Sequence, residues 1–138
     1  MIKKSFILSI VFLLLSIYFI NAENSKSKGV FMNLSVEEFY KKIIDTSGDK
    51  NYILIDVRTP AEYKESHIDK SINIDFYAKD FKDQINKLDK SKKYLLYCHS
   101  GNRSGQTLDL MKKADFLEVY NLKGGIGSWS SKSYPLVK

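Results

Sequence analysis

The chain has 138 residues, with 22 lysines and arginines against 16 acidic residues, 43% hydrophobic residues and one cysteine. This length holds one domain and a leader, because two cores of ordinary size need roughly 200 residues. The ample apolar content and the single cysteine exclude disorder and a disulfide framework. Only Arg58 and Arg103 are arginines, and lysines alternate with acids along the chain, so the charge indicates a solvated surface and no nucleic-acid partner.

Residues 1–22 have the pattern of a targeting segment. Two lysines lie near its start, the run Phe6–Ile20 carries no charge, and Ala22 offers a small residue for cleavage. As a helix this run spans about 22 Å, which is shorter than the roughly 30 Å hydrocarbon core of a bilayer. We therefore expect a signal peptide that is cleaved after Ala22, with an uncleaved N-terminal anchor as the alternative.

Both alternatives predict export of the rest of the chain to the periplasm or another extracytoplasmic compartment. The polar stretch that follows, residues 23–30, is expected to be a tether, and residues 31–138 are expected to form the domain. We expect this domain to be a monomer, and to contact a membrane only if the N-terminus stays uncleaved.

The apolar pattern of the domain alternates between helical and extended spacing. Ser35 and Glu38 form a capping-box signature ahead of apolar residues at helical spacing, which predicts an amphipathic helix ending near Ser47–Gly48. The run Tyr52–Val57 is almost wholly apolar and rich in β-formers, as in a strand covered on both faces of a parallel sheet. The segment Arg58–Thr59–Pro60 ends that strand.

The later elements follow the same alternation of strands and helices. In chain order we expect a strand near a sheet edge at Ser71–Ile74, a helix at Phe81–Leu88, a buried strand at Tyr94–Cys98, a helix from about Ser104, a strand at Glu118–Leu122 and a short helical turn around Trp129. Strands separated by helices predict an α/β fold with a mostly parallel central sheet and helices on both faces.

Cys98 closes a buried strand, at the sheet edge where open α/β folds place their ligands. A loop of small and turn-forming residues separates it from the next helix, so backbone N–H groups and the helix amino end can surround the sulfur. Such an environment favours the thiolate, which is the nucleophilic form, and Arg103 can add a fixed charge beside it. The alternative is that Cys98 is a small buried hydrophobe that ends a core strand.

Several spaced motifs resemble the rhodanese family, in the right order and over nearly the whole chain after the leader. The active-site segment CHSGNRSG spans Cys98–Gly105, and VYNLKGGIGSW follows it at Val119–Trp129. The segment LIDVRTPAEYKESHI, Leu54–Ile68, resembles the second family signature, and SINI at Ser71–Ile74 matches the strand after it. Three departures lie in loops: Ser66 and Asp115 replace glycines, and Asp69–Lys70 replaces a Pro-Gly turn.

This resemblance implies the rhodanese fold and sulfur transfer through a persulfide on Cys98, without a cofactor. It implies that Cys98 and Arg103 are the catalytic residues. The backbone amides of the loop, from His99 through Ser100, Gly101 and Asn102 to Ser104, would cradle the transferred sulfur or an incoming anion.

A phosphatase or arsenate reductase with the same fold is a rival interpretation, because both use Cys-x5-Arg. This chain has Cys98-x4-Arg103, and the sixth place after the sulfur is Ser104. The shorter loop suits a single sulfur atom better than a tetrahedral oxyanion, which disfavours the phosphatase.

Other polar residues give weaker signals. Asp56 and Arg58 are candidate second-loop contacts to substrate, although a structural brace between Arg58 and Glu62 or Asp56 is favoured. His67 is expected to anchor a loop by a hydrogen bond, and His99 is a candidate donor to an anion.

Two further motifs are interpreted as structural. The only Cys and His side chains are Cys98, His67 and His99, and they do not make a closed tetrahedral zinc set, so no metal is expected. Gly124–Gly125 lacks the GK[ST] element of a phosphate loop and is expected to be a turn before Trp129, a core aromatic.

The sequence therefore favours an exported sulfurtransferase that takes sulfur from a sulfane donor such as thiosulfate and passes it to a thiol or cyanide. A noncatalytic rhodanese-like module, which binds a partner or senses oxidants through Cys98, is the competing hypothesis. One arginine in the loop is a modest field for a dianion, which predicts poor use of thiosulfate.

Overall fold

The computed structural model describes residues 29–138, which form a five-stranded parallel sheet with the strand order β1-β5-β4-β2-β3. The expected leader and most of the expected tether lie outside the described residues. The strands are β1 (Val30–Leu34), β2 (Tyr52–Asp56), β3 (Ile72–Asn73), β4 (Lys93–Tyr97) and β5 (Glu118–Leu122). The helices are α2 (Val36–Asp45), α3 (Pro60–Glu65), α4 (Phe81–Asn86), α5 (Asn102–Lys113) and α6 (Gly125–Ser131).

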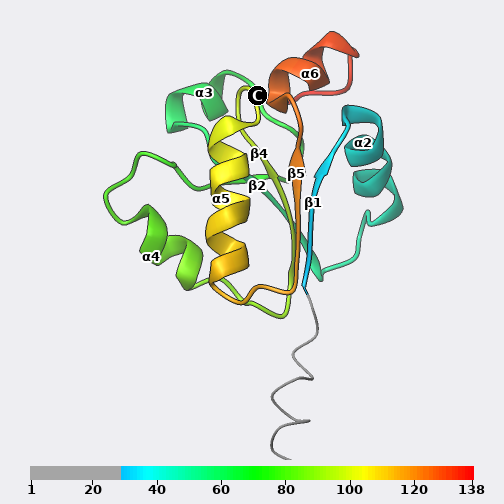
Figure 1. The fold of residues 1–138 in the computed structure, drawn as a ribbon. Coiled ribbons are helices and arrows are strands. Elements are labelled where there is room, and N and C mark those ends of the chain that lie inside the picture. The colour runs from blue at the N-terminus through cyan, green and yellow to red at the C-terminus, as the bar shows by residue number, and fades with distance from the viewer. Residues whose placement is uncertain (1–28) are drawn as a thin grey trace, which may run out of the picture.

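Helices cover both faces of the sheet, as the alternating pattern predicts (Figure 1). On one face, α4 and α5 pack against the strands through Phe81, Ile85, Leu108 and Met111. On the other face, α2 and α6 bury Phe39 and Trp129, whose rings meet edge to face with centroids 6.5 Å apart. The fold class is therefore the expected α/β one, and Trp129 is the expected core aromatic.

Local sequence signals explain where most elements begin. Ser35 caps α2 with a full capping box to Glu38, as predicted. The turn after β2 contains a second capping box, between Thr59 and Glu62, and Pro60 occupies the first turn of α3. The sequence pattern indicates only the end of a strand at Arg58–Thr59–Pro60, so α3 is an element that was not predicted.

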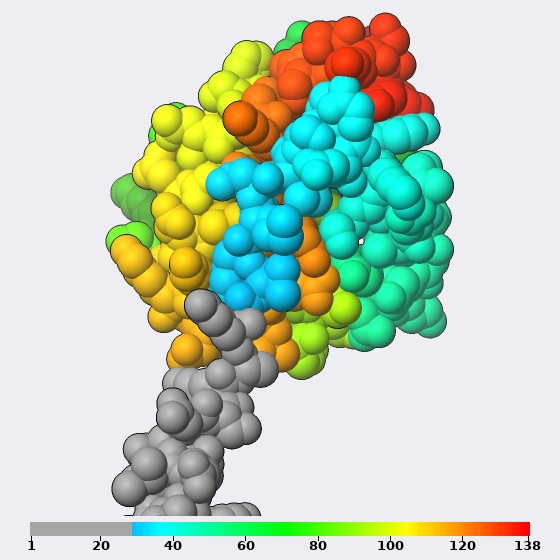
Figure 2. All heavy atoms as spheres, turned by 45° about the vertical axis from the view of Figure 1, so that its right-hand side comes forward, coloured from blue at the N-terminus to red at the C-terminus, as the bar shows by residue number. Residues whose placement is uncertain are grey.

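One strand is not predicted by the sequence, and one helix begins earlier than expected. The strand β1 was not predicted, because only Leu34 of its five residues is buried and its apolar signal is weak. It pairs with β5 at the sheet edge, where it is open to solvent (Figure 2). The helix α5 begins at Asn102, two residues before the expected start at Ser104, because Gly101 adopts the left-handed conformation that turns the chain into the helix.

All five strands point the same way, so their carboxyl ends share one edge. The amino ends of α3, α5 and α6 gather at that edge (Figure 1). Within residues 29–138, no helix is long and apolar enough to cross a membrane.

Candidate active site

Cys98 lies directly after β4, in the short loop that leads into α5. Its side chain is fully buried, and it belongs to the apolar cluster beneath α5. Burial alone does not separate a nucleophile from a core residue, so the contacts of its sulfur decide between the two interpretations.

Hydrogen-bond donors converge on the Cys98 sulfur. The Gly101 N–H donates to Sγ at 3.1 Å, and the Ser104 hydroxyl donates at 3.3 Å. Burial raises the pKa of the Cys98 thiol, but the Ser104 hydroxyl and the amides of Ser104, Gly101 and Ser100 outweigh it and leave the pKa lowered. The loop therefore favours the thiolate, as the sequence predicted.

The helix α6 fixes the shape of this loop from behind. The Ile126 N–H donates to the Cys98 carbonyl at 2.8 Å, and the Gly127 N–H donates to the His99 carbonyl at 3.1 Å. In a trans peptide the N–H points away from the C=O, so the bond from Gly127 to the His99 carbonyl turns the Ser100 N–H away from α6. The Ser100 amide is one of those that lower the pKa of Cys98, so the amino end of α6 orients one of the amides that act on this sulfur.

Glycines make this close approach of loop and helix feasible. A Cβ on Gly125 would collide with the His99 carbonyl oxygen, and a Cβ on Gly101 would lie 3.1 Å from the Leu122 carbonyl oxygen. Gly101, Gly124 and Gly125 all have positive φ angles, of 92°, 81° and 58°. Gly124–Gly125 form the expected turn, but their close contact with the Cys98 loop was not predicted.

Arg103 was expected to add a fixed charge beside Cys98, but its guanidinium pairs with a carboxylate. Its guanidinium forms two hydrogen bonds with the Glu62 carboxylate of α3, at 2.9 Å and 2.8 Å, and lies 5.4 Å from the ring centroid of Tyr77. The Arg103 hydrogen bonds lower the pKa of Glu62 to about 2. Arg103 is close enough to Cys98 for an electrostatic interaction, but the N–H groups of Arg103 donate to Glu62 and not to the sulfur.

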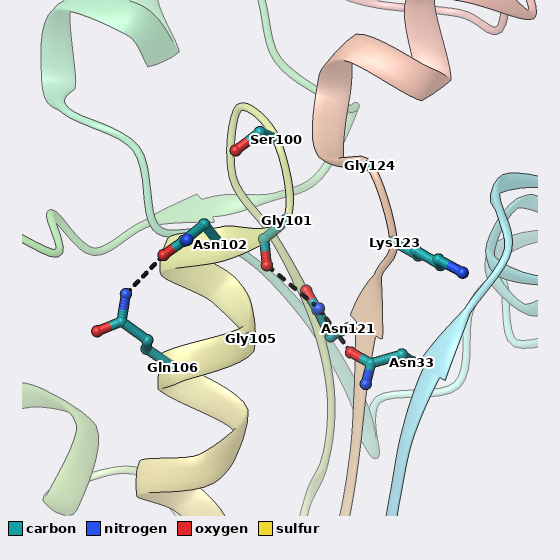
Figure 3. A pocket seen from close by; sticks show the side chains of 9 residues that line it. All are labelled: Asn33, Ser100, Gly101, Asn102, Gly105, Gln106, Asn121, Lys123 and Gly124. Atoms are coloured by element: carbon teal, nitrogen blue, oxygen red, sulfur yellow. Dashed lines mark hydrogen bonds between the residues drawn. The ribbon is translucent and has the colours of Figure 1, made fainter.

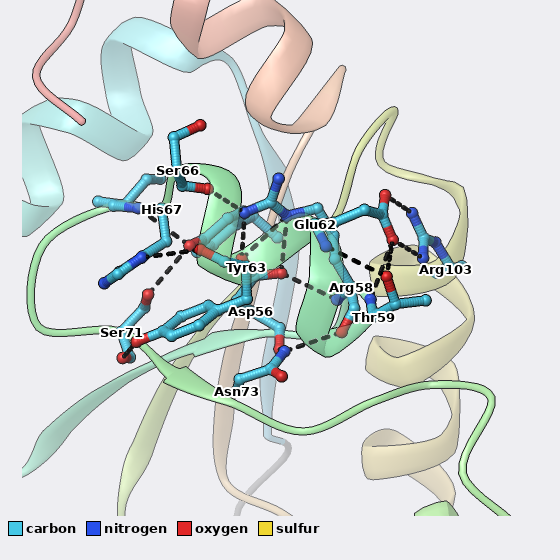
Figure 4. A network of polar contacts seen from close by, with 12 residues as sticks. Asp56, Arg58, Thr59, Glu62, Tyr63, Ser66, His67, Ser71, Asn73 and Arg103 are labelled. Carbon is cyan, nitrogen blue, oxygen red and sulfur yellow. Dashed lines mark hydrogen bonds and ion pairs between the residues drawn. The ribbon is translucent and has the colours of Figure 1, made fainter. Parts of the chain in front are cut away.

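Asp56 and Arg58 form the structural brace that the sequence analysis favoured (Figure 4). The Arg58 guanidinium bonds the Asp56 carboxylate at 2.7 Å and 2.9 Å and the Ser66 carbonyl at 2.6 Å. Asp56 is fully buried and Arg58 is 4% exposed, and the Arg58 donors are engaged with Asp56 and with the Ser66 carbonyl. Glu62, the other partner considered for Arg58, pairs with Arg103 instead.

His67 is the expected loop anchor. Its Nδ1 lies 3.0 Å from the Tyr63 carbonyl, and its ring stacks on the Tyr63 ring with centroids 3.8 Å apart. Its backbone N–H donates to the Val137 carbonyl, which ties the carboxyl-terminal segment to this loop.

The remaining predicted loop residues divide by role. His99 and Ser100 are exposed at the loop tip, while the Asn102 side chain accepts a bond from Gln106 at 2.6 Å, away from the sulfur. Ser104 is fully buried and occupies the sixth place after Cys98, where phosphatases of this fold have their arginine. No group of three metal-ligating side chains is found in residues 29–138.

The family model for the rhodanese-like domain matches residues 35–132, which include this loop and the brace beside it. The chain belongs to the rhodanese-like family. The uncharacterized protein YqhL of Bacillus subtilis is 33% identical over 129 residues, covering 94% of this chain and 95% of that protein. The thiosulfate:glutathione sulfurtransferase of Saccharomyces cerevisiae is 33% identical, covering 80% of this chain and 88% of that enzyme.

The crystal structure of a rhodanese-related protein has the same fold. The rhodanese-related protein of Thermoplasma volcanium is 30% identical, with a TM-score of 0.65, and the match covers 78% of this chain and 98% of that one. At two positions where the family pattern has glycine, this chain has another residue but keeps a left-handed backbone. Lys70 and Asp115 take φ angles of 62° and 60° there.

Proposed function

We propose that this rhodanese-like protein is a sulfurtransferase that carries a sulfane sulfur as a persulfide on Cys98. The observation that supports it most is the set of donors on the Cys98 sulfur, which lowers the pKa of a buried thiol. A cysteine that acted only as a buried apolar side chain would not require hydrogen-bond donors at its sulfur. Relatives named as sulfurtransferases support the same class of reaction.

The reaction is a double displacement in which charge balances at each step. The Cys98 thiolate attacks the outer sulfur of a sulfane donor such as thiosulfate, the S–S bond of the donor breaks, and sulfite leaves with the electron pair. A thiolate or cyanide then attacks the outer sulfur of the persulfide, and the Cys98 thiolate is released. The persulfide is itself anionic, so the same amides and the Ser104 hydroxyl stabilise both forms.

The Glu62 carboxylate weakens the field that Arg103 offers to an anionic donor. Because the pair is nearly neutral, a dianion such as thiosulfate gains little charge attraction at the loop. We therefore expect thiosulfate to load Cys98 slowly, and donors of lower charge to load it at lower concentration.

Intact-protein mass spectrometry tests the proposal. After incubation with thiosulfate and with an organic persulfide, the wild type should gain the mass of one sulfur atom, and cyanide should remove it. Cys98→Ser should show no gain and an unchanged circular dichroism spectrum, and Ser130→Ala, an exposed change on α6, should load like the wild type. An unmodified wild type with every donor would overturn the proposal and favour the noncatalytic module.

The length of the loop separates sulfur transfer from phosphoryl transfer. Because Ser104 holds the place that an arginine needs for a tetrahedral oxyanion, we expect negligible hydrolysis of aryl phosphates. A glycine inserted between Gly101 and Asn102 should reduce the rate of sulfur transfer. A displacement of about 1 Å in the position of reacting groups can cost on the order of 100-fold in rate. Robust Cys98-dependent phosphatase activity of the wild type would contradict this loop-size argument.

The place of action is a separate proposal that rests on residues 1–22 alone. We propose that the protein is exported and acts as a monomer outside the cytoplasm. Amino-terminal sequencing of protein from the cell envelope should begin at or near Glu23. An intact Met1 in the membrane would support an uncleaved anchor, and an intact Met1 in the cytosol would overturn export.

A further inference from the structure

The charge of the folded domain is divided unevenly between its two ends. Lysines alternate with acids along the sequence, but the fold brings the segments that precede β2, β4 and β5 together at the edge where the strands begin (Figure 1). This end, residues 49–51, 87–93 and 112–118, is the amino-edge face. It has four acids, Asp49, Asp89, Asp115 and Glu118, and seven lysines, Lys50, Lys87, Lys90, Lys92, Lys93, Lys112 and Lys113.

The rest of the domain is balanced in charge. Residues 29–138 contain eighteen basic and fifteen acidic side chains, so eleven of each sign lie outside the amino-edge face. The opposite edge carries the Cys98 loop, and Lys123 is the charged one of the nine residues that line the groove beside that loop (Figure 3). The whole surplus of positive charge in the domain therefore belongs to the amino-edge face.

Contacts between its segments hold the amino-edge face together. The Lys93 N–H donates to the Asn51 carbonyl at 2.8 Å, and the Lys93 ammonium pairs with Glu118 at 3.0 Å. The Val30 N–H donates to the Leu117 carbonyl at 2.7 Å, which joins the start of β1 to the same surface. These bonds make the face one continuous surface across four strand starts.

Most of these lysines are exposed, and apolar side chains are exposed beside them. Leu117 is 46% exposed, and Val30, which bonds to it, is 42% exposed. Lysine at the end of a helix offsets the helix dipole, which explains Lys112 and Lys113 at the end of α5. That reason does not apply to loop lysines such as Lys50. The exposed lysines of the face are Lys50, Lys87, Lys90, Lys112 and Lys113.

An anionic lipid surface matches this combination of groups. Lysines are attracted to lipid phosphates, and an apolar side chain can enter the boundary between headgroups and acyl chains. Nucleic-acid recognition favours arginine, whose planar fork binds phosphate in two places. Both arginines of the domain, Arg58 and Arg103, lie toward the opposite edge and pair with carboxylates.

The chain also enters the domain at this face. The strand β1 begins at Val30, and eight residues separate Gly29 from Ile20, the last residue of the apolar run. Eight residues span at most about 28 Å. An apolar run that stays in a bilayer would therefore keep the amino-edge face close to the lipid, and Lys26 and Lys28 would add to its charge.

We propose that the amino-edge face binds the surface of an anionic phospholipid bilayer. Its exposed lysines contact lipid phosphates, and Leu117 enters the headgroup region. The helix α5 runs from the Cys98 loop to Lys113, about 17 Å at 1.5 Å per residue, so the bound domain presents Cys98 to the aqueous phase. The sequence predicted a membrane contact only through an uncleaved N-terminus, whereas this contact belongs to the domain itself.

Vesicle sedimentation tests this contact. The protein is residues 23–138, which cleavage after Ala22 would leave and which contain every strand and helix of the described domain. It should bind vesicles with about one third phosphatidylglycerol in phosphatidylcholine, and should not bind pure phosphatidylcholine. Salt at about 0.5 M should release it, because salt screens exposed charges. Equal binding to both vesicles, or binding to heparin without binding to vesicles, would overturn the proposal.

Paired lysine variants test whether the face or the total charge is responsible. Lys112→Gln combined with Lys113→Gln should weaken binding to the anionic vesicles by about fivefold for each lysine removed. Lys64→Gln combined with Lys123→Gln removes the same charge from exposed positions on α3 and after β5, and should weaken binding less than twofold. Equal losses in the two double variants would contradict a specific face.

A second pair tests the apolar contact. Leu117→Thr should weaken vesicle binding several-fold. Ile72→Thr is the matched control, because Ile72 is 45% exposed on β3 at the other side of the sheet, and it should bind like the wild type. Circular dichroism should show that both variants fold. A folded Leu117→Thr with unchanged binding would show that Leu117 does not enter the lipid.

The orientation is tested with nitroxide labels on the lipid headgroups. In bound protein, the amide NMR signals of residues 113–117 should broaden more than those of residues 99–101. The rate at which iodoacetamide alkylates Cys98 should be the same with and without vesicles. Stronger broadening in the loop, or alkylation that slows as the protein binds, would contradict this orientation. None of these measurements depends on sulfur transfer, so the lipid contact and the sulfurtransferase function can fail separately.

Discussion

Two neighbouring strands, β2 and β4, each end at a buried group that carries negative charge, and the two charges are stabilised in different ways. At the end of β2, the buried Asp56 carboxylate is fully paired with Arg58. At the end of β4, the buried Cys98 sulfur receives neutral donors and has no ion-pair partner of its own. A charge that is completely paired holds the structure in place, whereas one stabilised only by neutral hydrogen bonds stays available for reaction.

The Glu62–Arg103 pair joins these two sites. Glu62 accepts from the Thr59 backbone and hydroxyl at the start of α3, and it also accepts from Arg103 of α5 (Figure 4). The pair therefore fixes α3 against the first turn of α5, and it holds the charge of Arg103 away from the sulfur.

Breaking the buried brace should give the largest effect. Arg58→Leu leaves the Asp56 carboxylate buried without its partner, and we expect a loss of about 3 to 5 kcal/mol in the free energy of unfolding by urea. The double variant Asp56→Asn with Arg58→Leu removes the buried charge and should recover part of that loss. A loss below about 1 kcal/mol in the single variant would show that the brace is not structural.

The Glu62–Arg103 pair should contribute less to the free energy of unfolding than the Asp56–Arg58 brace, because it is partly exposed. Glu62 has a folded pKa of about 2, below its ordinary value of 4.5, so its stabilisation is present above pH 4.5 and is lost as the pH falls toward 2. Glu62→Gln should cost about 2 kcal/mol at neutral pH, after allowance for solvent screening. The difference between the two proteins should shrink as the pH falls through this window, and a constant difference would contradict the assignment.

The same variant sharpens the contrast between the sites. With Glu62 neutral, the Arg103 charge is no longer compensated, so thiosulfate should load Cys98 at a lower concentration in Glu62→Gln than in the wild type. Loading by an organic persulfide, which carries less charge and releases a thiolate when Cys98 takes its outer sulfur, should change less. A lower affinity for thiosulfate in the variant would show that the pair positions the loop rather than limiting its charge.

The Ser104 hydroxyl should have a smaller effect, confined to the sulfur. Ser104→Ala removes one donor from Cys98 Sγ, and we expect the pKa of Cys98 to rise, because the Ser104 hydroxyl lowers it in the wild type. The rate of alkylation by iodoacetamide as a function of pH measures this change. Ser100→Ala, which alters only an exposed loop side chain, is the control and should leave the pKa unchanged.

Lys70→Gly should give the smallest effect. Lys70 holds a left-handed backbone conformation at an exposed turn, which a residue with a Cβ adopts at a cost. Glycine removes that cost but adds freedom to the unfolded chain, so the expected gain in unfolding free energy is below about 1 kcal/mol. Lys64→Gly, placed inside α3, should instead destabilise the protein.

The sequence predicted the parts of this structure that local patterns encode. Buried strands such as β4 appear as apolar runs, and the α2 cap appears as a capping box, because both depend on neighbouring residues. The edge strand β1 was missed because most of its side chains are exposed, and its pairing with β5 joins residues that are far apart in the sequence.

The same limit applies to the site. The position of Cys98 before a glycine-containing loop and a helix start indicated a nucleophile from adjacent residues alone. The pairing of Arg103 with Glu62 spans 41 positions, and the contact of Gly125 with the His99 carbonyl depends on how α6 packs. Neither leaves a local pattern, although the Thr59–Glu62 capping box was a visible sign that a helix starts beside the loop.

The pKa of Cys98 in the wild type tests the central claim most directly. Cys98 is the only cysteine of the chain, so alkylation by iodoacetamide reports on this thiol without interference. Because the loop donors outweigh burial, the alkylation rate should rise with pH through a midpoint below the ordinary thiol value of 9.0. A midpoint at or above that value would show that burial dominates and that Cys98 is a core residue rather than a nucleophile.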